Sequence, residues 1–207
     1  MGRGAQDYTE QEEQVREILS DIRKRGDAAL FAYTKRWDGL EANPETLCVT
    51  PEEIEEAYQQ VSPDLLDVVR ESAKNIREYH SMQVRQGFVL EKPGIRLMQR
   101  IHPLARVGVY VPGGQAAYPS SVLMNIIPAK VAGVEEILMA SPAGADGKLP
   151  PLTLVAANEA GADRIFKMGG AQAIGALAYG TQTVPRVDKI TGPGNIFVAL
   201  AKRAVFG

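Results

Sequence analysis

The chain has 207 residues, of which 45% are hydrophobic, and its 23 basic and 25 acidic residues give a formal net charge of −2. This length is enough for one large domain or two small ones. The nearly balanced charge, without a long block of like charges, argues against a nucleic acid or an anionic membrane as partner. No apolar stretch is long enough to span a membrane, and the polar residues 1–13 do not resemble a secretory signal. The single cysteine, Cys48, excludes an internal disulfide and indicates a reducing cytoplasm.

The first half of the chain is charged and mainly predicts helices. Apolar residues recur at helical spacing from Val15 to Ile22, and a second helix continues to Gly39. Two further helix starts carry an N-cap followed by proline, at Thr50 with a capping-box glutamate and at Ser62. The remaining elements are strands, a short one at residues 47–49 and a hairpin formed by residues 88–90 and 95–101.

The second half is rich in Gly, Ala and β-branched residues, and it alternates strand and helix patterns. The predicted strands are residues 107–111, 136–140, 164–167 and 187–190, and the predicted helices between and after them are residues 120–133, 151–161, 170–180 and 195–205. Such alternation predicts an α/β fold with a parallel sheet and flanking helices. We therefore expect a helical region with a hairpin at residues 1–103 and a Rossmann-like domain at residues 104–207.

Three glycine-containing turns in the second half are the candidate binding site. They are the Tyr110 turn (Tyr110-Val-Pro-Gly-Gly114), the Gly169 turn (Gly169-Gly-Ala-Gln172) and the Gly192 turn (Gly192-Pro-Gly-Asn195). Each has an ordinary structural reading, because a glycine pair can simply form a turn, Gln172 can be an early helix residue and Asn195 can be an N-cap. Strand ends of a parallel sheet face one crevice, however, so Tyr110, Gln172 and Asn195 together predict a nucleotide site.

Conventional catalytic and metal-binding residues are scarce. His80 and His102 are isolated in the sequence and have no metal-ligand spacing, and Cys48 has no obvious activating neighbour. No Walker loop, GxGxxG motif or Gly-x-Ser-x-Gly motif is present. We therefore expect no catalytic residue and no metal ligand within this chain.

The same turns carry a resemblance to histidinol dehydrogenase. The matching stretches are Arg106-Val-Gly-Val-Tyr-Val-Pro-Gly-Gly114, Gly169-Gly-Ala-Gln-Ala-Ile174, Val184-Pro-Arg-Val-Asp-Lys-Ile-Thr-Gly-Pro-Gly-Asn195 and Ala201-Lys-Arg203. The resemblance covers essentially the whole chain, loosely before about Arg100 and specifically after it. It implies an incomplete Rossmann-like fold of the aldehyde-dehydrogenase-like group, in which the helical region 1–103 belongs to a domain completed by further C-terminal sequence.

The resemblance also implies a function. It indicates a zinc- and NAD-dependent, homodimeric enzyme that oxidises L-histidinol to L-histidine through L-histidinaldehyde, with Tyr110, Gln172 and Asn195 contacting NAD. The zinc ligands, the Glu–His acid/base pair and the substrate serine of that family have no counterpart before Gly207, so we expect this chain to be inactive by itself. A non-catalytic nucleotide-binding or interaction module is the alternative, and the reading frame downstream of Gly207 would distinguish the two. A closer relative of the aldehyde dehydrogenases is disfavoured, because no nucleophilic cysteine lies near the crevice.

Overall fold

The computed structural model describes residues 8–113, 117–144 and 146–206, and a parallel sheet forms its centre. The sheet consists of β3 (Arg106–Tyr110), β4 (Glu136–Ser141), β5 (Arg164–Lys167) and β6 (Lys189–Thr191), in the spatial order β5-β4-β3-β6. All three pairings are parallel. The first strand of the sheet, β3, lies in its interior. The next two strands, β4 and β5, are added on one side of β3, and β6 is added on the other side, as in one half of a doubly wound fold. This confirms the predicted α/β class.

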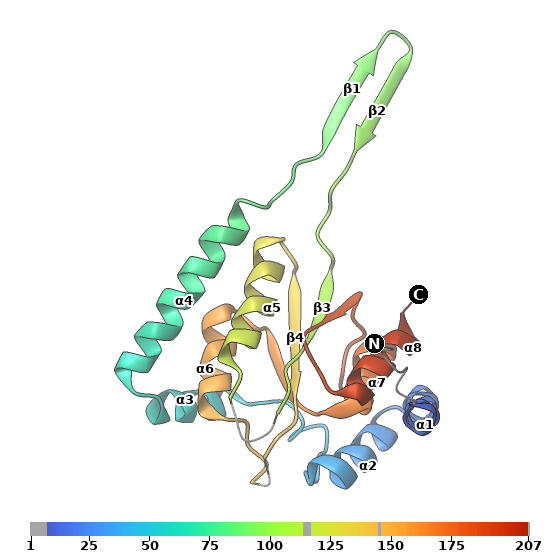
Figure 1. Ribbon diagram of the computed structural model, residues 1–207, viewed down its shortest axis with the longest axis vertical. Coiled ribbons are helices and arrows are strands. Elements are labelled where there is room, and N and C mark those ends of the chain that lie inside the picture. Colours follow the sequence, from blue (N-terminus) through green and yellow to red (C-terminus); the bar gives the residue numbers. More distant parts are fainter. Residues whose placement is uncertain (1–7, 114–116, 145, 207) are drawn as a thin grey trace, which may run out of the picture.

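Helices cover both faces of the sheet (Figure 1). One core joins β-strand residues such as Leu138 and Phe166 to helices α1, α2, α7 and α8, and the other joins Ile137 and Met139 to helices α3 to α6. The helices are α1 (Thr9–Arg25), α2 (Asp27–Asp38), α3 (Pro51–Gln60), α4 (Pro63–Ser81), α5 (Pro119–Val131), α6 (Pro151–Ala160), α7 (Gly170–Tyr179) and α8 (Ile196–Val205). Successive residues of β4 enter opposite cores, which is why residues 137–140 are all apolar.

The N-terminal helices begin where their capping residues predict. The Thr50 hydroxyl accepts a hydrogen bond from the Glu53 N–H, and the Glu53 carboxylate accepts one from the Thr50 N–H, which completes the capping box of α3. The Ser62 side chain accepts from the Leu65 N–H and caps α4. Helices α1 and α2 pack in one of the two cores with the sheet, and α3 and α4 pack in the other. The division after residue 103 stays a prediction.

The hairpin lies apart from these cores. Its strands β1 (Phe88–Lys92) and β2 (Ile95–Gln99) pair antiparallel, and all ten of their residues are exposed. Figure 1 shows the hairpin extending from the body of the molecule beyond α4 and β3. Its pairing confirms the predicted hairpin, and its apolar side chains do not face a core.

The structure corrects two predicted strands, at residues 47–49 and at residues 187–190. Residues 47–49 form a single antiparallel bridge, Cys48 to Phe166, in which the Val49 N–H donates to the Ile165 carbonyl and the Lys167 N–H to the Leu47 carbonyl, both at 2.8 Å. The strand expected at residues 187–190 is β6, which begins two residues later. The Val187 N–H donates to the Leu177 carbonyl of α7 instead of joining the sheet.

Candidate functional site

A cavity of about 340 Å³ lies at the carboxyl ends of the parallel strands. It is lined by Gln14, Ile18, Trp37, Asp38, Tyr110, Pro112, Gly113, Pro142, Gly170, Ala171, Gln172, Asn195 and Phe197. The three residues predicted from the glycine turns, Tyr110, Gln172 and Asn195, are therefore brought together around one space. The strand order reverses between β3 and β6, and such a switch point at the carboxyl ends of the strands is where open α/β sheets bind their ligands. Gly114, the last residue of the Tyr110 turn, lies outside the described residues.

Tyr110 ends β3 and connects the Tyr110 turn to the Gly169 turn. Its side chain is buried, and its hydroxyl accepts a hydrogen bond from the Gly170 N–H at 3.1 Å. Burial raises the pKa of the Tyr110 hydroxyl, the charge of Asp38 raises it further, and the Gly170 N–H opposes this shift. Tyr110 is therefore a neutral phenol near neutral pH, which leaves its hydroxyl hydrogen free to donate.

Gln172 lies in the first turn of α7 and is held by an aspartate from a distant part of the chain. The side chain of Gln172 is 1% exposed, and its Nε2 donates to Asp38 Oδ2 at 3.3 Å. The same Asp38 oxygen accepts the Gly169 N–H at 3.0 Å. Asp38, the last residue of α2, thus closes the N-terminus of α7, where the helix dipole favours a negative charge.

Asp38 is a site residue that the sequence reading missed. Burial raises the pKa of its carboxyl, and the hydrogen bonds from Gly169 and Gln172 oppose that shift. Within the described part of the chain it forms no salt bridge. One signal was present in the sequence: an acidic residue in the last turn of a helix is opposed by the helix dipole, so it needs a tertiary reason to be there.

Asn195 is both the N-cap of α8 and a wall of the cavity. Its Oδ1 accepts a hydrogen bond from the Val198 N–H at 3.1 Å, so Asn195 has the N-cap role that the sequence allowed for it. A residue of α8 holds the preceding Gly192 turn in place, because the Lys202 ammonium donates a hydrogen bond to the Gly192 carbonyl. Burial lowers the pKa of Lys202. Asn195 itself is exposed, so its amide remains accessible from the cavity.

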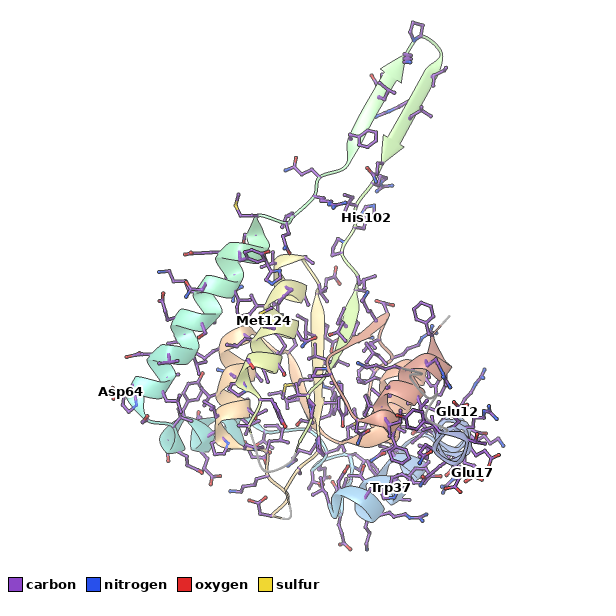
Figure 2. The ribbon with its side chains drawn as sticks, in the orientation of Figure 1. Glu12, Glu17, Trp37, Asp64, His102 and Met124 are labelled. Atoms are coloured by element: carbon purple, nitrogen blue, oxygen red, sulfur yellow. The ribbon has the colours of Figure 1, made fainter. Side chains whose placement is uncertain are left out.

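A partly exposed aromatic side chain lines the cavity. Trp37, labelled in Figure 2, precedes Asp38 and is 40% exposed. Its ring stacks on Tyr33 with centroids 4.9 Å apart and planes 4° from parallel. The stacking holds the indole in place without burying it.

The two histidines and the cysteine lie away from this cavity. His80 and His102 both line a separate groove of about 700 Å³ beside α4 and α5, and Figure 2 shows His102 on the segment between β2 and β3. His80 Nδ1 is 2.8 Å from Gln83 Oε1, and Cys48 packs against the core. Across the described residues, no group of three or more His, Cys, Asp or Glu side chains could hold a metal ion, and no helix is long and apolar enough to cross a membrane.

Comparison with known proteins identifies the family of this chain. A family model described as histidinol dehydrogenase matches residues 1–207. This chain belongs to the histidinol dehydrogenase family. Among its relatives, histidinol dehydrogenase from Bacillus subtilis (strain 168) is 56% identical over 199 residues, and that from Heliobacterium mobile is 55% identical over 195 residues.

A solved structure extends the agreement to three dimensions. The crystal structure of histidinol dehydrogenase from Elizabethkingia anophelis matches with a TM-score of 0.90 at 35% identity and covers 99% of this chain. In each case the match covers only 46% of the relative. The chain therefore spans less than half the length of these histidinol dehydrogenases.

Proposed function

We propose that this chain supplies the NAD-binding part of an enzyme that oxidises L-histidinol to L-histidine through L-histidinaldehyde, a reaction of histidine biosynthesis. The observation that supports it most is the convergence of Tyr110, Gln172 and Asn195 on one cavity at the switch point of the sheet. Family membership supports the reaction, since the relatives are named for it. The lone cysteine agrees with a cytoplasmic site of action.

The residues of the cavity fit a part of NAD. A space of about 340 Å³ is at the lower end of small-molecule sites and suits one nucleoside end of the dinucleotide. Tyr110 can donate its hydroxyl hydrogen to it, Asn195 can donate or accept, and the glycine turns bring backbone close without side chains in between. When bound, NAD supplies the acceptor for the hydride that leaves the alcohol carbon.

Zinc does not fit the residues described in this structure. Zinc in proteins is held by three or four His, Cys, Asp or Glu side chains, and the described residues contain no such group. We propose that the zinc ligands and the acid/base pair lie on sequence that this chain does not contain. The chain alone then binds the cofactor without completing the reaction.

Titration with NAD, followed by NMR chemical shifts or calorimetry, tests the binding site. We expect a dissociation constant of roughly 0.1 to 1 mM or weaker, because only part of the site is present. Asn195→Ala should weaken binding by about 5-fold to 160-fold, the equivalent of one lost hydrogen bond worth about 1–3 kcal/mol.

Loss of the α8 cap must be separated from loss of the NAD contact. Ser62→Ala is the matched control, because it removes a similar N-cap hydrogen bond from α4, away from the cavity. The control should bind NAD like the parent chain. If NAD moves resonances far from Tyr110, Gln172 and Asn195 and none near them, the proposed site is wrong.

The absence of turnover is tested separately. NADH formation at saturating L-histidinol, with and without added zinc, should not exceed the buffer blank. Protein prepared from a host that lacks its own histidinol dehydrogenase removes the main source of contamination. Turnover in such a preparation, or one zinc retained per chain after dialysis, would contradict the proposal that these parts lie elsewhere.

We also propose that the protein forms a homodimer, as the family resemblance implies. The exposed apolar residues of the hairpin support this, because contiguous apolar surface of that kind marks contact surfaces. Light scattering coupled to size-exclusion chromatography would give the mass in solution, and a monomer at high concentration would contradict it for this chain.

A further inference from the structure

The cavity has an unusual charge. Among the described residues that line it, Asp38 is the one charged side chain, and no lysine or arginine is among them. Burial raises the pKa of the Asp38 carboxyl, whereas the two hydrogen bonds to it and the N-terminus of α7 favour its ionised form. A ligand that enters this space therefore meets the Asp38 carboxyl, which is negative when ionised, and no cation.

The N-terminus of α7 is already occupied by protein groups. The Gly169 N–H donates to Asp38, and the Gly170 N–H donates to the Tyr110 hydroxyl. These are two of the N–H groups that would hold a phosphate at the start of such a helix. With both bonded and a carboxylate in front of them, this end of the cavity suits an uncharged sugar or base.

Asp38 retains the capacity to accept a further hydrogen bond. Both bonds given above end on Oδ2, and no donor from the described residues is bonded to Oδ1. A carboxylate oxygen that borders a cavity and accepts from a ribose hydroxyl is how many dinucleotide sites recognise NAD. A phosphate attached at the same hydroxyl would offer no hydrogen and would add negative charge.

The residues that line the cavity indicate which end of the cofactor enters it. The reacting nicotinamide must meet a base that accepts the hydroxyl proton. Apart from Asp38, whose carboxylate is held against α7, the lining residues include no histidine, glutamate or lysine. The adenosine end, which takes no part in the chemistry, is the end that these walls suit.

We propose that Asp38 selects NAD over NADP, by accepting a hydrogen bond from the adenosine ribose and by repelling a 2′-phosphate at that position. This rests on the proposed function of the cavity. In that role Asp38 has two tasks: Oδ2 positions Gln172 and the Gly169 turn, and Oδ1 faces the ligand. The carboxylate reaches the site from α2, 131 residues before Gly169 in the chain.

Dissociation constants for NAD and NADP, measured on the 207-residue chain by the same titration, test the proposal. The parent chain should bind NADP at least about tenfold more weakly than NAD. Asp38→Asn keeps the shape of the side chain and an oxygen that can accept, but it removes the charge. The ratio of the two constants should fall towards one in this variant, mainly because NADP binds more tightly.

Glu41→Gln is the matched control. Glu41 is an exposed carboxylate three residues further on, paired with Lys35 and absent from the cavity wall. This substitution makes the same change in net charge, so it should leave the NADP to NAD ratio as in the parent chain. A general structural defect in Asp38→Asn would weaken both cofactors alike and would not move the ratio.

The outcomes separate the two proposals. If neither cofactor binds the folded parent chain, the proposed function fails. If NAD binds at the three turns but the parent chain takes NADP equally well, the role of Asp38 is overturned whatever the variant does. The same conclusion follows if NADP is discriminated against and Asp38→Asn leaves the ratio unchanged.

Discussion

The hairpin β1–β2 and the sheet β3–β6 have similar apolar sequences, but the fold treats them differently. The sheet strands β3, β4 and β5 are almost entirely buried, whereas every residue of the hairpin is exposed. Apolar, β-branched runs thus predict extended backbone in both places but do not predict what covers it. In the sheet, helices from both halves of the chain supply the cover, and the turns at its strand ends form the cavity. The hairpin contributes nothing to that cavity and exposes large side chains such as Phe88, Leu90 and Leu97.

Truncation of one leucine in each region should give the largest contrast. Leu138 in β4 is fully buried, so Leu138→Ala should reduce the free energy of unfolding by about 2–5 kcal/mol through lost burial and a cavity. Leu97 in β2 is 56% exposed in the single chain, and Leu97→Ala should change the free energy of unfolding of the monomer by no more than about 0.5 kcal/mol. Equilibrium denaturation with urea at several protein concentrations measures both. A large loss in Leu97→Ala that depends on concentration would show that the hairpin is buried against another molecule in solution.

Glycine substitutions probe the turns of the two regions. Gly192 has φ +99°, and a Cβ there would lie 1.9 Å from the Tyr110 carbonyl oxygen, so the backbone would have to move. Gly192→Ala should cost about 2–4 kcal/mol and weaken NAD binding, because it displaces Tyr110 and the Gly192 turn.

Gly94, in the hairpin turn, is the matched control for Gly192. It also has a positive φ, +73°, but a Cβ would meet nothing within 4 Å. Gly94→Ala should cost only the backbone strain, about 1 kcal/mol, and leave NAD binding unchanged. Thermal unfolding and the NAD titration check both variants, and an equal loss in the two would mean that close approach at Gly192 is unimportant.

The contrast also explains which parts of the molecule the sequence could predict. Helix starts are encoded by neighbours in the chain, so Thr50, Ser62 and Asn195 were recognisable as N-caps, and the alternation of strands and helices was enough for the α/β class. Strand ends of a parallel sheet converge by topology, which is why Tyr110, Gln172 and Asn195 could be grouped before their positions were known.

What the sequence could not supply depends on distant contacts. Asp38 joins the site through Gly169 and Gln172, which are 131 and 134 residues away, and no local pattern encodes such a pairing. The exposure of the hairpin could not be predicted for the same reason, because burial of a strand depends on segments that are distant in the sequence. The shift of β6 likewise follows from a bond between Val187 and Leu177 of α7.

Removal of a carboxylate from each region should give the smallest effect, and its sign should depend on pH. Because burial raises the pKa of Asp38 above its ordinary value of 3.8, the folded state disfavours the ionised form. The contribution of Asp38 to stability is therefore greatest below that value and is lost as the pH rises through its raised pKa. Asp38→Asn should become more stable relative to the parent chain between about pH 4 and pH 7, by a small margin.

Glu91→Gln in the hairpin is the control for this pH dependence. Glu91 pairs with Arg96 at 3.2 Å, and both side chains are about two-thirds exposed, 67% and 64%. Exposed ion pairs contribute little, so this variant should follow the stability of the parent chain at every pH. Urea denaturation of all three proteins at pH 4, 5.5 and 7 makes the comparison. If Asp38→Asn loses stability as the pH rises, the hydrogen bonds to the charged carboxylate outweigh its burial. If Asp38→Asn gains stability relative to the parent chain as the pH rises, the ionised carboxylate at position 38 destabilises the fold. Such a cost is common for groups that are retained for ligand recognition.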